Sequence, residues 1–427
     1  MSTGAPFDGY HRRETPLPDP ELTQVGPGTP AGEYLRRFWQ PVAFAREIAE
    51  TPLRVRTMGE DLVVFRSLAG ELGVLEEHCP HRRASLRYGT VEREGIRCAY
   101  HGWKFSPAGD CLEIPMGPAS AEGRAHARAT AYRAEELGGL VFAYLGPEPA
   151  PLLPRFDLFV WEGVLRDVGR ALIPCNWLQI MENSVDPAHL EWLHGHHLAA
   201  QRRGQGLPEP RHYRKRQVKL GFDRFRYGIV KRRVLEGGSE EDDDWKIGHP
   251  LVFPVSLRVG SDPQHRFQIR VPVDDGHTQH YWYSCYRPPD PSLLSPQAEI
   301  PVYEVPWRDE KGDFIVDYVD GQDIMTWVTQ GAIADRTREH LSASDRGIVL
   351  LRELLFEQLA RVERGLDPLG VVRDPEENRI IELPQERNKY RDGAGFLAES
   401  LALSHVRYSP LRAEIARLLG GRPGARP

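Results

Sequence analysis

Short stretches of alternating apolar and polar residues, separated by turn sequences, fill the chain from about residue 37 to residue 145. The stretches 53–58 and 62–67 flank the turn Gly59-Glu60-Asp61, which is the pattern of a β-hairpin. A second turn leads into another apolar stretch at 72–75. The pattern therefore predicts an all-β unit in this part of the chain.

A proline-dense segment, 146–154, follows and is typical of a linker between domains. A chain of 427 residues is too long for one compact core. We therefore expect an N-terminal extension over 1–36, a β domain over 37–150 and a second domain over 151–427.

The second domain mixes strand and helix patterns. Asn176 can cap a helix that runs to about Ser184, with Gln179 completing a capping box. Asp186-Pro187 restarts the helix, and Gly195 can end it. Strand-like segments and later helices follow, at 218–233, 251–259, 266–273, 280–286, from Asp320 onward and at 342–365. This domain is therefore predicted to be α+β, with helices packed against an antiparallel sheet.

Composition excludes several classes of protein. The formal net charge of −6 does not suit a protein that binds nucleic acid through its phosphates. The N-terminus lacks the apolar core of a signal peptide, and no apolar run approaches the length of a membrane span. Five cysteines form no disulfide framework. We therefore expect a cytoplasmic protein that binds neither nucleic acid nor membrane.

Two Cys/His pairs carry the clearest chemistry: Cys79-Pro80-His81 and, sixteen residues later, Cys98-Ala99-Tyr100-His101. Two thiolates and two imidazoles can hold one zinc ion, but zinc fingers usually pair Cys with Cys on one arm and His with His on the other. A [2Fe–2S] cluster with both thiolates on one iron and both imidazoles on the other suits one ligand of each kind per loop. Gly102 would let backbone N–H groups approach the sulfurs, and Trp103 would shield the cluster from water.

The wider stretch CPHRRASLRYGTVEREGIRCAYHGWKF resembles the Rieske domains of ring-hydroxylating oxygenases. The resemblance implies a Rieske [2Fe–2S] domain followed by a catalytic α+β domain of helix-grip type. Arg83 is a departure, because these sequences usually have Gly at that position.

A second group, Asp186, His189 and His194, has the D-x2-H-x4-H spacing of oxygenase α subunits. Two histidines and one carboxylate form the facial triad of non-haem Fe(II) oxygenases and leave positions open for O2 and substrate. His189 and His194 would lie about 140° apart on a regular α-helix, so the helix must loosen or end there. By resemblance, Asp186 is the bridging carboxylate that links His189 to a cluster histidine of a neighbouring subunit, and Asn183 lies near the iron.

The third iron ligand is expected to be an Asp from the C-terminal part, with Asp323, Asp335 and Asp345 as candidates. The string from Gln330-Gly331 through Asp335-Arg336 to Ser344-Asp345-Arg346-Gly347 resembles phthalate dioxygenase-like oxygenases, in which the Asp of the Ser-Asp pair binds iron. We therefore choose Asp345, with Asp335 as the alternative.

The sheet over 218–286 is expected to line the substrate cavity. Among its aromatic and cationic residues, Tyr227, Arg232 and Trp282 are the candidate substrate contacts, and an arginine could hold a carboxylate by a bidentate contact.

The sequence shows no glycine-rich dinucleotide motif, so the electrons should come from a separate NAD(P)H reductase, with or without a ferredoxin. The resemblance implies a homotrimer, or a dimer of trimers, and a terminal oxygenase that uses O2 and two electrons. Within that family we favour O-demethylation of a lignin-derived methoxylated aromatic acid such as vanillate or dehydrodivanillate. The alternatives are cis-dihydroxylation of a phthalate-like ring, a Rieske protein that only transfers electrons, and a structural zinc protein.

Overall fold

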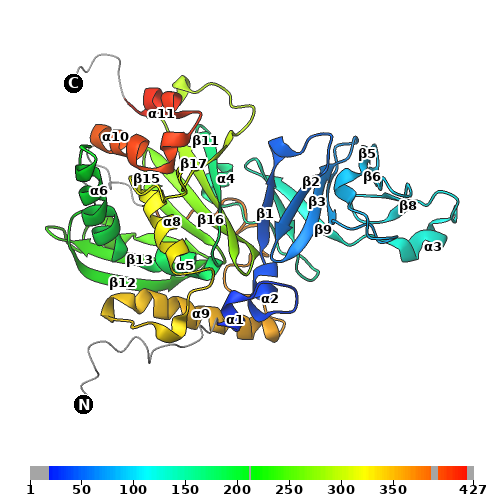
Figure 1. Ribbon diagram of the computed structural model, residues 1–427, viewed down its shortest axis with the longest axis horizontal. Helices are drawn as coiled ribbons and strands as arrows, with labels where there is room; N and C mark the ends of the chain where they lie inside the picture. The colour runs from blue at the N-terminus through cyan, green and yellow to red at the C-terminus, as the bar shows by residue number, and fades with distance from the viewer. Residues whose placement is uncertain (1–18, 211–212, 386–392, 421–427) are drawn as a thin grey trace.

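The computed structural model describes residues 19–210, 213–385 and 393–420. In these residues the chain forms two lobes that lie one after the other along the long axis of the molecule (Figure 1). The lobes share a hydrophobic core, in which the ring of Phe44 meets that of Tyr281 at 5.3 Å and the ring of Phe142 meets that of Phe159 at 5.6 Å.

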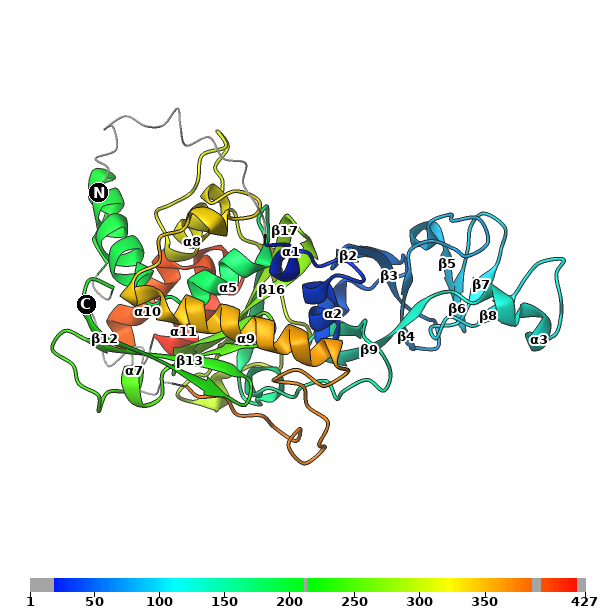
Figure 2. The same cartoon turned by 90° about the horizontal axis from the view of Figure 1, so that it is seen from below.

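The smaller lobe is built from two antiparallel sheets. The larger sheet has the order β1-β10-β9-β4-β3-β2. Its strands are β1 (Trp39–Phe44), β2 (Leu53–Thr57), β3 (Glu60–Arg66), β4 (Leu72–Glu76), β9 (Ala131–Leu137) and β10 (Leu140–Tyr144). The smaller sheet runs β5 (Thr90–Glu92), β6 (Gly95–Arg97), β7 (Lys104–Phe105) and β8 (Cys111–Glu113). Figure 2 shows this smaller sheet at the end of the molecule farthest from the other lobe.

The predicted hairpin is present, with a shorter turn than expected. Strands β2 and β3 pair from Thr57–Glu60 outward, so the connecting loop is Met58-Gly59. Both loop residues have positive φ, which is the requirement of a type I′ turn.

The larger lobe contains one eight-stranded sheet with the order β12-β13-β14-β15-β16-β17-β11-β18. Its strands are β11 (Leu165–Ile173), β12 (Gln217–Phe225), β13 (Gly228–Leu235), β14 (His249–Val252), β15 (Ser256–Ser261), β16 (Gln264–Asp274), β17 (His277–Tyr286) and β18 (Val302–Glu304). All neighbours are antiparallel except β11 and β18, so the sheet is mixed at one edge rather than wholly antiparallel.

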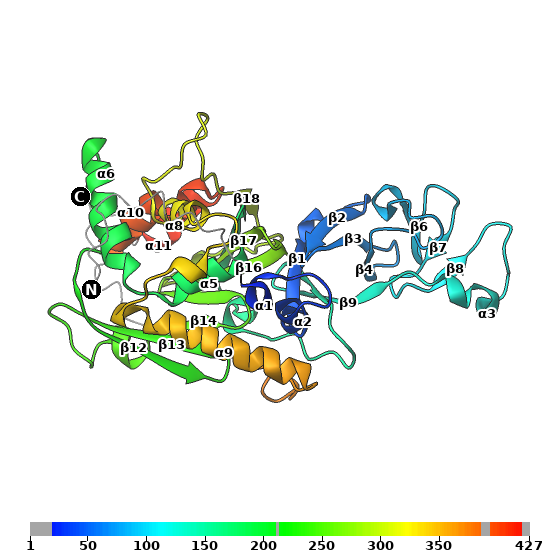
Figure 3. The same cartoon turned by 60° about the horizontal axis from the view of Figure 1, so that its bottom comes forward.

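Helices cover this sheet, as Figure 3 shows. They are α4 (Asp157–Val160), α5 (Trp177–Val185), the π-helix η5 (Leu190–His197), α6 (Leu198–Gly204), α7 (Asp243–Lys246), α8 (Val319–Thr329), α9 (Arg346–Glu363), α10 (Gly393–Leu403) and α11 (Arg412–Leu419). Helix α5 packs on β16, and α9 packs on β12. Among the described helices, none is long and apolar enough to cross a membrane.

Two details of the predicted helices need correction. Asn176 does cap α5, because its side chain accepts the N–H of Leu178 at 3.1 Å. Gln179 does not complete a capping box, since its amide instead bonds the backbone after α8. Gly195 does not end a helix, because η5 continues directly into α6.

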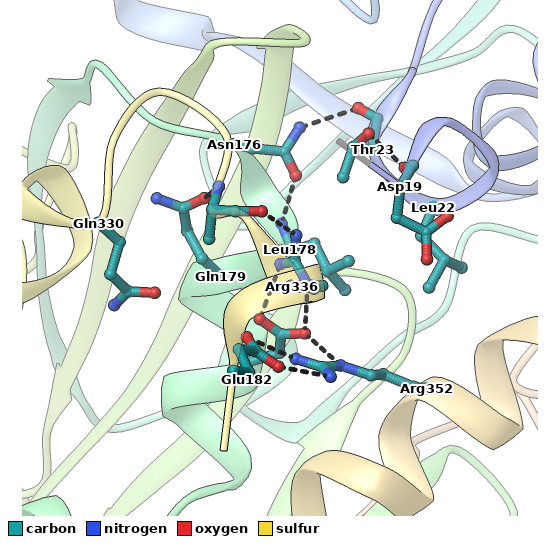
Figure 4. Close-up of polar contacts among 12 residues, drawn as sticks. Asp19, Leu22, Thr23, Asn176, Leu178, Gln179, Glu182, Gln330, Arg336 and Arg352 are labelled. Carbon is teal, nitrogen blue, oxygen red and sulfur yellow. Dashed lines mark hydrogen bonds and ion pairs between the residues drawn. The ribbon is translucent and has the colours of Figure 1, made fainter. Parts of the chain in front are cut away.

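The segment 19–36, here called the N-terminal strap, joins both lobes. It contains α1 (Pro20–Thr23) and α2 (Pro30–Arg36). The carbonyl of Thr23 accepts a hydrogen bond from the side chain of Asn176 at the start of α5 (Figure 4). The carbonyl of Leu22 accepts one from the side chain of Trp177. At its other end Arg36 donates to the carbonyl of Met58 and pairs with Glu60 in the smaller lobe.

Candidate metal centres

The Cys79 and Cys98 loops fold in the same way. In each loop the cysteine N–H donates to the carbonyl five residues on, Cys79 to Ala84 at 2.9 Å and Cys98 to Trp103 at 2.8 Å. In each, the cysteine carbonyl accepts the N–H of the fourth residue on, Arg83 or Gly102. The two loops therefore present Cys and His from matching positions.

The four side chains converge at the outer end of the smaller lobe. Both cysteines are buried, and the rings of His81 and His101 lie 4.5 Å apart. Burial, together with the nearby Cys98, raises the pKa of the Cys79 thiol to about 11. Two sulfurs forced together in this way suit a metal cation that stabilises them as thiolates. His81 also stacks on Trp103 at 4.4 Å, which covers one side of the group as predicted.

Arg83 has a backbone conformation that glycine adopts more readily than arginine. Its φ is +60°, and the matching residue of the other loop, Gly102, has a φ of +74°. A left-handed backbone favours glycine because it has no Cβ. Arg83 tolerates the position with its guanidinium paired to the carboxylate of Glu76.

The second group lies in the larger lobe, where a π-helix brings two histidines together. In η5 the backbone is wound more loosely than in an α-helix, so residues five apart come to lie over one another. His189, at its N-cap, and His194 have ring centroids 5.2 Å apart. The expected loosening of the helix is thus present, as a π-helix and not as a helix end.

Asp323, on α8, is the carboxylate that meets these histidines. Its Oδ1 lies 3.2 Å from His194 Nε2 and 3.8 Å from His189 Nε2. One ligand atom from each of the three residues lies within 4.8 Å of the others. The carboxylate oxygen is buried and has no hydrogen-bond partner, which is costly unless a cation binds there. The three residues therefore fit a mononuclear iron with open coordination positions.

The other nitrogen of each imidazole is held by a neighbour. His189 Nδ1 lies 3.2 Å from Asp186 Oδ2, and His194 Nδ1 lies 3.1 Å from Gln322 Oε1. These contacts leave both Nε2 atoms directed at Asp323, which is the usual arrangement around metal-binding histidines. Burial alone would raise the pKa of Asp186, but the hydrogen bond and charge of His189 and two backbone N–H groups lower it. Asp186 therefore stays ionised and fixes the tautomer of His189.

The choice of Asp345 as the third ligand is corrected to Asp323. Asp345 accepts the backbone N–H of Ser342 in the capping box of the short 3-10 turn 343–345, directly before α9, and it is not part of the His189 group. Asp335 likewise caps a short helix, through the N–H of Thr337. The sequence contains Asp323 as a candidate but gives no sign that α8 packs against η5. Gln322, which holds His194, was missed for the same reason.

Two hollows adjoin the histidine group. An inner cavity of about 220 Å³ is lined by His189, His194 and Asp323 and by strands β13 to β16. An outer groove of about 710 Å³ is lined by Asp186, His189 and Trp192. Asn183 lines both hollows.

The three residues chosen as substrate contacts do not line the inner cavity. Tyr227 donates to Glu377, Trp282 is buried beside Trp327, and Arg232 pairs with Asp223 on the opposite face of β13. Side chains alternate along a strand, so Lys231 and Arg233 face the cavity instead. Arg232, the arginine named as a candidate substrate contact, therefore lies on the side of β13 that faces away from the inner cavity.

Comparison with protein families gives three matches along the chain. The Rieske [2Fe–2S] domain matches residues 38–124, the vanillate O-demethylase oxygenase C-terminal domain matches 173–300, and the "LigXa C-terminal domain like" family matches 308–382. Together they cover both metal-binding groups.

Among curated proteins, the 5,5'-dehydrodivanillate O-demethylase oxygenase subunit of Sphingobium sp. is 40% identical over 85% of both chains. The phthalate 4,5-dioxygenase oxygenase subunit of Pseudomonas putida is 33% identical over 83% of this chain and 88% of that one. Among solved structures, NdmA of Pseudomonas putida CBB5 shares the fold with a TM-score of 0.57 at 20% identity, over 78% of this chain and 93% of that one. The chain therefore belongs to the α subunits of Rieske ring-hydroxylating oxygenases and is a Rieske non-haem iron oxygenase.

Proposed function

We propose that the chain is the terminal oxygenase of an O-demethylase that acts on a lignin-derived methoxylated aromatic acid. With O2, two electrons and two protons, the reaction would convert a methoxy group to a phenol and release formaldehyde and water. Support comes from the identity of 40% with a dehydrodivanillate O-demethylase subunit and from the vanillate O-demethylase domain match.

The inner cavity is the observation that carries the proposal. His189, His194 and Asp323 form part of its wall, and another part holds the cationic residues Lys231 and Arg233. Both cationic side chains are buried; Lys231 donates to the carbonyl of Ser184 and Arg233 pairs with Asp244, each at 2.7 Å, so a substrate carboxylate would join an existing polar network. A carboxylate bound at these residues would hold an aromatic acid in the same cavity as the metal group.

Each metal-binding group has a distinct part in this chemistry. The bound iron would activate O2, and the Rieske cluster, held by Cys79, His81, Cys98 and His101, would supply electrons. Asp186 orients the imidazole of His189 from the groove side, while Gln322 orients that of His194. Asn183, which lines both hollows, would contact the ligands of the iron or the substrate.

An oxygenase subunit needs an electron-delivering reductase or ferredoxin. We further propose a homotrimer, or a dimer of trimers, in which the cluster of one subunit reaches the outer groove of the next. The cluster loops and the His189 group lie in different lobes of one chain (Figures 1 and 2). The cluster end exposes Arg82 and Tyr100, and the groove carries the carboxylate of Asp186, whose charge is opposite to that of Arg82.

Cis-dihydroxylation of an aromatic acid is the second candidate, because a phthalate 4,5-dioxygenase subunit is 33% identical. A test supplies the purified oxygenase with a matched reductase, NADH and a panel containing vanillate, dehydrodivanillate and phthalate. Release of formaldehyde with loss of a methoxy group would support the proposal. A cis-diol from phthalate would favour the second candidate, and substrate-independent consumption of NADH alone would count against both.

A further inference from the structure

A polar cluster outside the metal groups joins α5 to the segment that follows α8. The carboxylate of Glu182, buried in α5, accepts two hydrogen bonds from Arg336, at 2.9 and 2.7 Å (Figure 4). Arg352 of α9 donates a third bond to it at 2.7 Å and pairs with Glu339 as well. We call Glu182, Arg336, Glu339 and Arg352 the α5 clamp.

Gln179, one turn earlier on α5, is tied to the same segment. Its amide nitrogen donates to the carbonyls of Trp327 and Gly331, at 2.8 and 2.9 Å, and its oxygen accepts the N–H of Ala334 at 3.0 Å. Arg336 also donates to the carbonyl of Ala334. The segment 327–336 is therefore bound to α5 at two successive turns.

The clamp connects two elements that carry functional groups of the metal site. Helix α8 carries Asp323, and the segment 327–336 consists of its last residues and the chain that follows them. Asp186 is the C-cap of α5, and its N–H is bonded to the carbonyl of Glu182 at 3.2 Å. A shift of Glu182 would therefore move Asp186 relative to Asp323 and His189.

We propose that Glu182 and Arg336 are positioning residues that set Asp186 against the iron group, and thereby the delivery of electrons to it. This inference rests on the proposed role of Asp186. Bidentate Arg–carboxylate pairs fix geometry in two directions, and the clamp is charge-balanced, so it can lie beside Asp186 without changing its ionisation. The clamp residues Glu182, Glu339 and Arg352 line the outer groove together with Asp186.

The test compares Arg336→Gln, Arg336→Lys and Glu182→Gln with the wild type. The control is Glu357→Gln, which breaks an exposed ion pair on α9 with Arg224. Iron and sulfide contents are measured first. The reduced cluster is then mixed with O2 and the panel compound that the wild type converts best, and the rate of cluster reoxidation is followed by absorbance.

We expect full metal content but reoxidation at least about tenfold slower in Arg336→Gln and Glu182→Gln, because small displacements of reacting groups have effects of this size. Arg336→Lys should recover part of the rate, since lysine keeps the charge without the bidentate contact. Rates that match Glu357→Gln, or losses that only follow iron content, would overturn the proposal.

A second measurement does not depend on turnover. The EPR spectrum of the ferrous site with added nitric oxide reports how the iron ligands are arranged. It should change in Arg336→Gln, return towards the wild-type shape in Arg336→Lys and stay unchanged in Glu357→Gln. Spectra identical to that of the wild type in all variants would contradict the positioning role. A wild-type protein that converts no panel compound would instead contradict the proposed function.

Discussion

At the scale of single residues, Asp323 and Asp345 show that the surroundings of an aspartate decide whether it can bind a metal. Each follows a polar residue near the start of a helix: Gln322 precedes Asp323, and Ser344 precedes Asp345. Asp323 has a buried oxygen without a hydrogen-bond partner beside two imidazoles, whereas Asp345 uses its carboxylate on the backbone of Ser342. An unsatisfied buried carboxylate is the stronger sign of a metal ligand.

We predict that Asp323→Ala loses the mononuclear iron while the cluster stays, because only the two histidines then remain as ligands. Asp345→Ala should keep the iron and lower the free energy of unfolding by about 0.5–1 kcal/mol through loss of the cap. Iron and sulfide analysis and urea unfolding measure both effects. Iron loss in Asp345→Ala, with Asp323→Ala fully loaded, would reverse this assignment.

Arg83 allows a second prediction at this scale. A β-branched residue fits a left-handed backbone poorly, so Arg83→Val should lower the free energy of unfolding by about 1–2 kcal/mol. Arg83→Gly relieves the same strain and loses only an exposed ion pair, so it should be nearly neutral or slightly stabilising. Equal destabilisation by both changes would show that the ion pair with Glu76 matters more than the backbone.

The sequence predicted the cluster group well and the iron group only in part. Cys79 to His101 lie in one local segment, so their spacing alone predicts the group. Asp323 is more than a hundred residues from His194, and only the packing of α8 on η5 brings them together. Similarly, the sequence does not show which side of β13 faces the cavity, because that depends on which face of the sheet the helices cover. Arg232 was named as a candidate, whereas Arg233 lines the cavity.

At the scale of elements, η5 is the feature on which the iron group depends. Gly195 lies next to His194, and a Cβ there would come within 2.6 Å of the carbonyl oxygen of Tyr213. The π-helix therefore packs against the chain around Tyr213, with no room for a side chain at position 195.

We predict that Gly195→Ala displaces His194 and lowers iron content well below one per chain, because the clash is with backbone. Gly204→Ala, in α6, is a matched control, since no atom lies within 4 Å of its added Cβ. Metal analysis after dialysis against a weak chelator compares the two. An iron-loaded Gly195→Ala protein would show that η5 can adjust.

His405, buried against Trp282 and Ser284 of β17, makes a pH-dependent contribution to stability. Burial is the main cause that lowers the pKa of His405 from 6.5 to about 4; Asp320 opposes the shift and the charge of Arg266 adds to it. The unfolded chain takes up a proton that the folded chain excludes, so stability falls as the pH drops from 6.5 to about 4. Over that window the single site changes the free energy of unfolding by about 1.4 kcal/mol per pH unit.

We predict that His405→Gln flattens this part of the pH profile by the contribution of one proton. The measurement is urea unfolding of the metal-free protein at several pH values, with EDTA throughout. His277→Gln is the control, because His277 is exposed. Parallel profiles for wild type and His405→Gln would mean that His405 is protonated in the folded protein.

At the scale of the whole molecule, the two metal groups occupy separate lobes, and the smaller sheet that carries the cluster lies at the far end (Figure 2). This separation supports the expectation that electrons pass between subunits. That expectation came from the family resemblance, because no pattern in the sequence indicates how the two lobes are placed.

We predict that two inactive variants restore activity when they assemble together. Cys98→Ser lacks the cluster and Asp186→Ala lacks the bridging carboxylate, but a mixed oligomer contains a working cluster next to a working iron group. The two chains are co-expressed with different tags and purified through both tags. We expect this doubly tagged mixture to be active and the combination of separately purified variants to be inactive. An inactive mixed oligomer would instead favour electron transfer within one chain.

The N-terminal strap has a consequence for recombination between related oxygenases. Because Leu22 and Thr23 bind the start of α5 before the chain enters the smaller lobe, the larger lobe is made from two separate stretches of sequence. A chimera joined only at the proline-dense segment 146–154 would combine a strap from one parent with an α5 from the other. Exchange of the cluster-bearing lobe as a module therefore needs two crossovers, one near residue 37 and one near residue 150, so that strap and α5 stay from one parent.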